Sequence, residues 1–323
     1  RRRDGLGRGY FRGSGEGADI VRDAGIRVSV RSIRRHILHL ILASPWLNAC
    51  ADNVSKEAAA PHPDLGDHVT FYGVGKVARY QQHMDSSLEY LGPLFFAEIF
   101  IAATGEVSDA SVTFPPPVNA ERALQYEYSE SDEIGDVMYL SGVVETDEEL
   151  EAQYPTGAYR FNFSTPGGDV VDSVVSFEGG GFPTQPVIIF EQDGARIPFD
   201  EVSPEQDLIV TWPPFTAGRT DENGILDDLI FVAIDSCTVE DFVHSGRPFE
   251  KDDYLTYRAS EYVVPAGTLA PGQTYSMYVE HALLPNTQQE YGMPAFATFA
   301  ASTYMDFRTS GTPDPAYCAE ASE

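Results

Sequence analysis

The segment from Glu261 to Leu284 most constrains the fold, because two alternating apolar runs flank a corner rich in proline and glycine. In a β-strand, successive side chains point to opposite faces. We therefore expect an inward set, Tyr275, Met277 and Val279, and an outward set, Ser276, Tyr278 and Glu280. The corner predicts a crossing between two stacked sheets, with the Tyr275 hydroxyl bonded to backbone a few residues upstream.

Similar apolar runs recur from residue 65 to residue 182, separated by turn residues and without helical periodicity. This spacing predicts an antiparallel β-sandwich. The expected strands are Val69–Tyr72, Val77–Gln82, Leu94–Ala102, Ala110–Phe114, Leu124–Tyr128, Val137–Val144, Tyr159–Ser164 and Ser173–Phe177. Thr146 and Glu149 fit a capping box, so we also expect a helix of one or two turns there.

A second sandwich is expected over residues 183–311, after a boundary rich in glycine and proline at 179–186. Its predicted strands are Val187–Glu191, Asp207–Trp212, Leu229–Ile234, Glu261–Val264, Tyr275–Ala282 and Ser302–Arg308. Alternation places two further sets of side chains inward: Leu208, Val210 and Trp212, and Thr303, Met305 and Phe307. Leu229–Ile234 is apolar on both faces, which is typical of a central strand.

The motif from Leu269 to Tyr275, with Pro271 and Gly272 between them, and the core position of Trp212 resemble fibronectin type III domains. The spacing from Pro155 to Tyr159 repeats that from Pro271 to Tyr275. The repetition favours an all-β chain of two tandem immunoglobulin-like sandwiches, the second of them fibronectin type III-like. The whole chain also resembles uncharacterised two-sandwich proteins exported by environmental bacteria, a resemblance that implies no activity.

The N-terminal region has the features of an export signal. We expect residues 1–30 to be untranslated upstream sequence or disordered, 31–50 to be a signal peptide, and 51–64 to be a tether. The end of the apolar core, directly before Cys50, resembles the lipobox of bacterial lipoproteins, which implies lipidation of Cys50. Cleavage after Ala51 and plain secretion, or a buried helix, are the alternatives. Either export route predicts a cell-envelope or secreted protein.

Export would leave Cys237 and Cys318 able to pair in an oxidising compartment. The fibronectin-like arrangement implies that Cys237 follows a strand whose end lies near the tail at 312–323. We therefore predict a disulfide between these two residues. Two unpaired thiols are the alternative.

The net charge of the chain limits which classes of molecule it can bind. The chain carries 21 basic and 50 acidic residues, for a net charge of −29. Such an acidic surface repels nucleic acid and anionic lipid, so neither is an expected partner. We expect an unknown protein or a polysaccharide at the cell surface, with the membrane engaged through the lipid anchor only.

Two sets of residues are candidate binding sites. Hard oxygen ligands around a glycine turn suit Ca²⁺, and the candidates are Asp221, Asn223, Asp227 and Asp228. A polar loop with acidic tips is the alternative, and no other cofactor is expected. The second set would stack on sugar rings from outward positions: Tyr257, Tyr262, Tyr278 and Tyr304.

Motifs for catalysis are missing from the sequence. The histidines form neither HxH nor HExxH, no G-x-S-x-G elbow occurs, and Gly73 to Lys76 lacks the spacing of a phosphate loop. No carboxylate pair stands in a recognisable glycosidase context. We therefore expect a non-enzymatic protein of structural or adhesive display. The alternatives are a carbohydrate-binding module, Ca²⁺-assisted or not, and a hydrolase on a β scaffold.

Overall fold

The computed structural model describes residues 62–128, 136–237, 242–246, 254–314 and 317. In these ranges the chain forms sixteen strands, one α-helix and one 3-10 helix, so the all-β prediction is confirmed. No helix in the described part is both long and apolar enough to cross a membrane. The expected signal peptide and nearly all of the expected tether lie outside the described residues.

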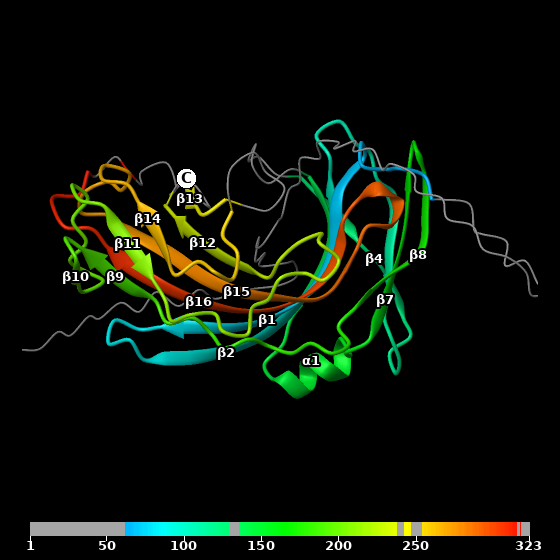
Figure 1. Ribbon diagram of the computed structural model, residues 1–323, viewed down its shortest axis with the longest axis horizontal. Coiled ribbons are helices and arrows are strands. Elements are labelled where there is room, and N and C mark those ends of the chain that lie inside the picture. The colour runs from blue at the N-terminus through cyan, green and yellow to red at the C-terminus, as the bar shows by residue number, and fades with distance from the viewer. Residues whose placement is uncertain (1–61, 129–135, 238–241, 247–253, 315–316, 318–323) are drawn as a thin grey trace, which may run out of the picture.

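An eight-stranded sheet runs through the middle of the molecule (Figure 1). Its strand order is β13-β12-β15-β16-β1-β2-β6-β5. The bounds, in that order, are Val243–His244, Leu229–Asp235, Thr274–Gln288, Ala295–Arg308, Val69–Gln82, Leu88–Ile101, Val137–Val143 and Gln125–Glu127. The four central strands have 14 or 15 residues each, which is long enough to serve both halves of the molecule.

Two four-stranded sheets pack on one face of the central sheet, one toward each end. The first has the order β4-β3-β7-β8, with bounds Glu121–Ala123, Ser108–Thr113, Ala158–Thr165 and Gly168–Ser176. The second has the order β10-β9-β11-β14, with bounds Ala195–Arg196, Ile189–Gln192, Leu208–Thr211 and Glu261–Val264. The two small sheets stand at opposite ends of Figure 1.

The second half has the strand arrangement expected from the fibronectin-like pattern. Strands β9, β11 and β14 pair antiparallel in one sheet, and β12, β15 and β16 pair antiparallel in the other. The inward sets predicted around Trp212, Met277 and Met305 are buried in the core between them. The Tyr275 hydroxyl accepts a hydrogen bond from the Ala270 amide at 2.8 Å, as predicted for the corner.

The two halves are not separate sandwiches, however. Strands β15 and β16 form one long hairpin whose far end, around Tyr291, is buried in the core of the first half. Strand β16 also pairs in parallel with β1, from Tyr72 beside Ala295 to Gln81 beside Tyr304. The predicted boundary at 182/183 therefore divides a shared sheet. Local sequence patterns carry no information on a pairing between strands that lie more than 200 residues apart in the chain.

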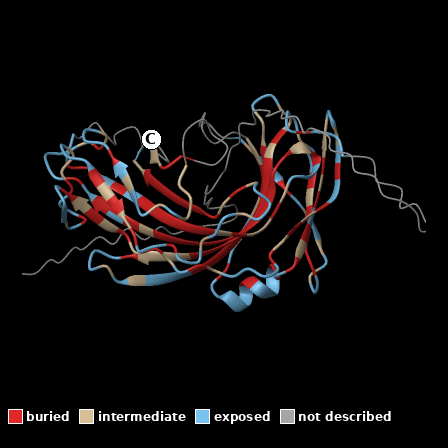
Figure 2. Ribbon diagram, in the orientation of Figure 1, coloured by how far each residue is buried: buried red, intermediate tan, exposed pale blue. Residues whose placement is uncertain are grey.

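The central sheet is covered on both faces, which corrects one expectation. Tyr278 and Glu280 were expected to point to solvent, but only 4% and 2% of their surfaces are exposed. They lie on the face opposite the two sandwich cores, where apolar side chains such as Phe96 and Leu284 form a third cluster. Figure 2 shows the buried stretch continuing along the central strands. The alternation of side chains correctly assigned Tyr278 and Glu280 to the face opposite the sandwich cores. Whether that face is exposed depends on the residues that pack on it.

Local signals in the first half are confirmed. Helix α1, Asp147–Gln153, begins at the N-cap Thr146, whose hydroxyl accepts from the Glu149 amide at 3.2 Å. The Glu149 carboxylate accepts in return from the Glu145 amide at 3.0 Å, one residue before the position of the usual capping box. The Tyr159 hydroxyl donates to the Pro155 carbonyl at 2.9 Å, so the repeated Pro-to-Tyr spacing makes a hydrogen-bonded corner in both halves.

Candidate functional site

The predicted Ca²⁺ ligands lie on the loop between β11 and β12, gathered around Asp221. Its Oδ1 accepts hydrogen bonds from the Asn223 amide and the Thr287 hydroxyl, and its Oδ2 accepts from the amides of Ile225 and Leu226. These distances are 2.8–3.1 Å. Partial burial raises the pKa of Asp221, but the hydrogen bonds from the backbone amides outweigh that effect, so the pKa is lowered. Asp221 therefore organises its own loop as a charged acceptor.

The other two candidate carboxylates of the loop, Asp227 and Asp228, are also engaged. Asp228 is 2% exposed and accepts from the amides of Leu284 at 2.7 Å and Arg219 at 2.8 Å. Burial raises the pKa of Asp228, and the hydrogen bonds from those two amides oppose the rise without cancelling it. Asp227 forms an ion pair with Arg258 at 2.8 Å. The loop is thus fastened to β15 through its acidic residues.

A pocket of about 260 Å³ lies beside this loop, bounded by Asp221, Asn223 and Asp228 on one side and by residues 284–287 on the other. Its carboxylate oxygens face amide and hydroxyl donors, which occupy the positions that a cation would need. Among the residues that the structure describes, no group of three or more His, Cys, Asp or Glu side chains could hold a metal ion. This geometry favours a fastening role for the loop.

The four candidate sugar-stacking tyrosines fall into two pairs. Tyr257 and Tyr262 pack against the core of the second half, and the Tyr262 hydroxyl donates to the His244 carbonyl at 2.7 Å. Tyr278 and Tyr304 lie on the opposite face of the central sheet, with ring centroids 5.5 Å apart and tilted by 40°. The structure therefore does not bring all four rings onto one platform.

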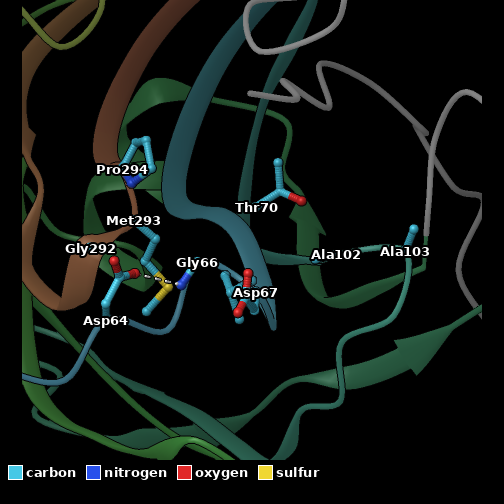
Figure 3. Close-up of a pocket in the computed structure, with 10 residues that line it drawn as sticks. Asp64, Gly66, Asp67, Thr70, Ala102, Ala103, Gly292, Met293 and Pro294 are labelled. Carbon is cyan, nitrogen blue, oxygen red and sulfur yellow. Dashed lines mark hydrogen bonds between the residues drawn. The ribbon is translucent and has the colours of Figure 1, made fainter. Parts of the chain in front are cut away.

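A larger pocket of about 560 Å³ opens where the start of β1, the end of β2 and the β15–β16 turn meet (Figure 3). Its polar lining includes the exposed Asp64 and Asp67 and the half-buried Thr70. The Asp64 carboxylate accepts from the Gly66 amide at 3.1 Å, and Met293 lies beside them. The described lining has two carboxylates and no histidine, cysteine or basic side chain, so it forms an acidic hollow.

Of the three cysteines in the predictions, only Cys237 is among the described residues. Cys237 is disulfide-bonded, and its sulfur lies 3.8 Å from the carbonyl oxygen of Tyr317. Cys318 and Cys50 lie outside the described residues. The pairing of Cys237 with Cys318 and the lipidation of Cys50 stay predictions.

Four buried acidic or basic residues on the central sheet were missed by the sequence reasoning. Lys76 is 1% exposed, donates to Glu151 at 3.0 Å and lies over the ring of Phe177. Burial lowers the pKa of Lys76, and the hydrogen bond and charge of Glu151 oppose the shift. Glu98, Glu280 and His281 are the other three. The sequence signal that could have found them is a charged residue within an alternating strand, but such a residue usually lies on the solvated face of a sheet.

No family model matches the chain, and no curated protein matches it. A search of solved structures found the FN1–FN3 domains of chicken CNTN1, with 10% identity and a TM-score of 0.23. The match covers 78% of this chain and 66% of that structure, slightly under two thirds of its length.

Proposed function

We propose that this chain is a non-enzymatic protein of the cell envelope, tethered through a lipid on Cys50, that holds a rigid pair of β-sandwiches away from the membrane for structural or adhesive contact. The observation that carries the proposal is the hairpin of β15 and β16, which belongs to both sandwich cores. A shared sheet prevents the two sandwiches from swinging independently. Rigidity of this kind suits a spacer or a display module.

The candidate sites support the same role, because their polar atoms are used inside the fold. Asp221 and Asp228 accept hydrogen bonds that fasten a loop to β15. The Tyr257 hydroxyl lies 3.1 Å from the Thr220 hydroxyl, and the Tyr278 ring is buried. Groups so engaged are poorly placed to bind a small ligand or to act in catalysis. The acidic surface adds solubility without attracting nucleic acid.

The anchor is tested by labelling growing bacteria that express the full chain with an alkyne-bearing fatty acid. We expect label on the wild-type protein and none on the Cys50→Ser variant, which should pass into the medium or the periplasm. Cys237→Ser is the matched control and should keep its label. An unlabelled wild-type protein, or equal labelling of Cys50→Ser, would defeat the lipid anchor.

Display is tested by adding protease and antibody to intact cells, with lysed cells as the reference. The proposal predicts that antibody against residues 183–311 binds intact cells and that protease removes the signal. A glycan array probed with the same protein, with and without Ca²⁺, tests the carbohydrate-binding alternative. Binding to one class of polysaccharide that is lost in Tyr304→Ala would favour sugar recognition over simple display.

A further inference from the structure

The segment between β8 and β9, residues 177–188, contains the expected domain boundary at 179–186 and is fastened to the central sheet. The Thr303 hydroxyl donates to the Pro186 carbonyl at 2.7 Å. The Gln82 side chain makes two hydrogen bonds of 2.8 Å with the backbone of Ile188. The third contact joins the His281 ring nitrogen Nδ1 to the Thr184 carbonyl at 3.0 Å. In Figure 1 this segment passes along the central strands on its way to β9.

His281 is the one titratable side chain among these three fasteners. Its ring stacks on Phe215 with centroids 4.3 Å apart and an angle of 7°, so it also holds the loop that follows β11. Because Nδ1 faces a carbonyl, it carries the proton in the neutral ring, and Nε2 is the unprotonated nitrogen. Nε2 is buried without a hydrogen-bond partner among the described residues, and only 3% of the residue is exposed.

Among the described residues that face His281, none carries a charge that would compensate a second proton. The residues opposite His281 on the neighbouring strands are Ile230 of β12 and Ala301 of β16, and Ala301 lies beside Ala78 of β1. None of these side chains can titrate. Thr184 and Phe215, which approach from the segment and the loop, cannot titrate either.

The ionisable groups carried by these elements lie elsewhere. On the strands, Asp235 ends β12, Glu280 bonds to Ser302 on the opposite face, and Asp306 and Arg308 lie at the end of β16. On β1, Lys76 bonds to Glu151 and Arg79 bonds to the Gly92 carbonyl. Glu178 lies at the start of the segment, and Arg219 and residues 221–228 belong to the loop. Desolvation by burial lowers the pKa of His281 to about 4, and the hydrogen bond to Thr184 opposes this fall. A charge on His281 is therefore disfavoured while its ring keeps these contacts with Thr184 and Phe215.

We propose that His281 is an acid-sensitive clasp that holds the segment 182–186 and the loop at Phe215 against the central sheet and releases both when it is protonated. The new proton must go to Nε2, which then needs water or an acceptor. Opening the Phe215 stack or lifting Thr184 supplies water. The bonds made by Gln82 and Thr303 do not depend on pH in this range, so release starts at His281.

The size of the effect follows from linkage. The open form has an ordinary histidine pKa near 6.5, and the closed form has a pKa of about 4. Between pH 7 and pH 5, opening therefore becomes more favourable by roughly twentyfold, because the open form takes up a proton that the closed form rejects. The proposal is independent of the envelope function, since it concerns the fastening within the fold.

The test is hydrogen exchange by mass spectrometry at pH 7 and pH 5, corrected for the intrinsic pH dependence of amide exchange. In the wild type, peptides covering 179–188 and 213–219 should lose roughly twentyfold in protection at pH 5. A peptide from β7 reports whether the whole fold loosens. His281→Asn is the matched variant, because the Asn amide nitrogen can reach the Thr184 carbonyl and does not titrate. Its protection should be the same at both pH values.

Two results would overturn the clasp. One is an equal loss of protection in the wild type and in His281→Asn, which would assign the acid response to other groups. The other comes from NMR titration of the His281 ring in the wild type, where a midpoint near the ordinary histidine value would show that the closed form tolerates the charge. If His281→Asn does not fold, the NMR titration alone decides.

Discussion

Glu280 and His281 are neighbours on β15 that face opposite sides of the central sheet, and burial moves their pKa values in opposite directions. Desolvation raises the pKa of Glu280 to about 7 and lowers the pKa of His281 to about 4. Each residue therefore favours its neutral form in the folded state. The two together make the central sheet sensitive to pH on both of its faces.

Replacing Glu280 with glutamine should stabilise the protein above neutral pH. The folded pKa is about 7 and the ordinary value is 4.5, so the folded state holds a proton that the unfolded chain has lost. Stability contributed by this group is therefore lost as pH rises from 4.5 through 7, and it amounts to on the order of 3 kcal/mol. Glu280→Gln keeps an acceptor for the Ser302 hydroxyl and should gain about that much at pH 8.

Urea unfolding at pH 4.5 and pH 8 measures the difference. At pH 4.5 the variant and the wild type should agree closely, because both side chains are then largely neutral. Glu261→Gln, on an exposed position of β14, is the control and should change little at either pH. A Glu280→Gln protein that is less stable than the wild type at pH 8 would contradict this description of the site.

Asp221 should matter for stability rather than for metal binding. Asp221→Ala removes the acceptor of three amides and of the Thr287 hydroxyl and should cost about 2–4 kcal/mol in the free energy of unfolding. Glu222→Ala, its exposed neighbour, should cost almost nothing. Addition of Ca²⁺ or of a chelator should leave the wild-type melting temperature unchanged. A rise with Ca²⁺ that disappears in Asp221→Ala would establish a calcium site instead.

At the scale of elements, the β15–β16 hairpin is the feature that joins the halves. Near its turn, the Asn286 side chain accepts from the Ser176 amide at 3.0 Å, and the Tyr291 hydroxyl lies 3.3 Å from the Val171 amide. Both contacts are made to β8, an edge strand of the first small sheet. The hairpin thus covers an edge that would otherwise offer unpaired amides and carbonyls.

Substitutions at Tyr291 should weaken the first half although the residue lies far beyond the predicted boundary. Tyr291→Ala removes a ring that is 5% exposed within the first core and should cost about 3–5 kcal/mol. Tyr291→Phe loses only the hydroxyl contacts with Val171 and should cost about 1 kcal/mol. Hydrogen exchange of β7 and β8 locates the loss. Unchanged protection of those strands in Tyr291→Ala would show that the hairpin end is dispensable there.

At the scale of the whole molecule, prediction succeeded where the governing interactions are local. Three local signals predicted the strands of the second half and helix α1. They are the proline and glycine before Tyr275, the alternation around Trp212 and the cap at Thr146. Strand β1 joins two runs that were expected as separate strands, Val69–Tyr72 and Val77–Gln82, because Gly73 and Gly75 interrupt the apolar pattern without interrupting the strand. A Cβ at Gly75 would lie 2.1 Å from the Phe96 ring, so packing requires glycine in that strand.

The remaining differences come from contacts that no local pattern encodes. The parallel pairing of β1 with β16 joins the two ends of the described chain, and it converts two sandwiches into one body with a common sheet. The same sheet buries Glu280, which alternation places on the outer face. The candidate carboxylates could be found from composition, but their donors, such as the Leu284 amide, belong to another strand.

The most direct test of the shared sheet is whether damage in one sandwich is felt in the other. In a chain that begins at residue 51, Trp212 is the only tryptophan, and it lies in the core of the second half. Phe161→Leu disturbs the core of the first half and should cost about 1–2 kcal/mol. Val143→Ala, at an exposed position, is the control.

Urea unfolding followed by Trp212 fluorescence and by circular dichroism provides the measurement. One cooperative sheet predicts a single transition by both probes, with Phe161→Leu lowering the Trp212 midpoint as much as the circular dichroism midpoint. Two transitions, with the Trp212 midpoint unmoved by Phe161→Leu, would contradict the shared sheet as the element that unites the molecule.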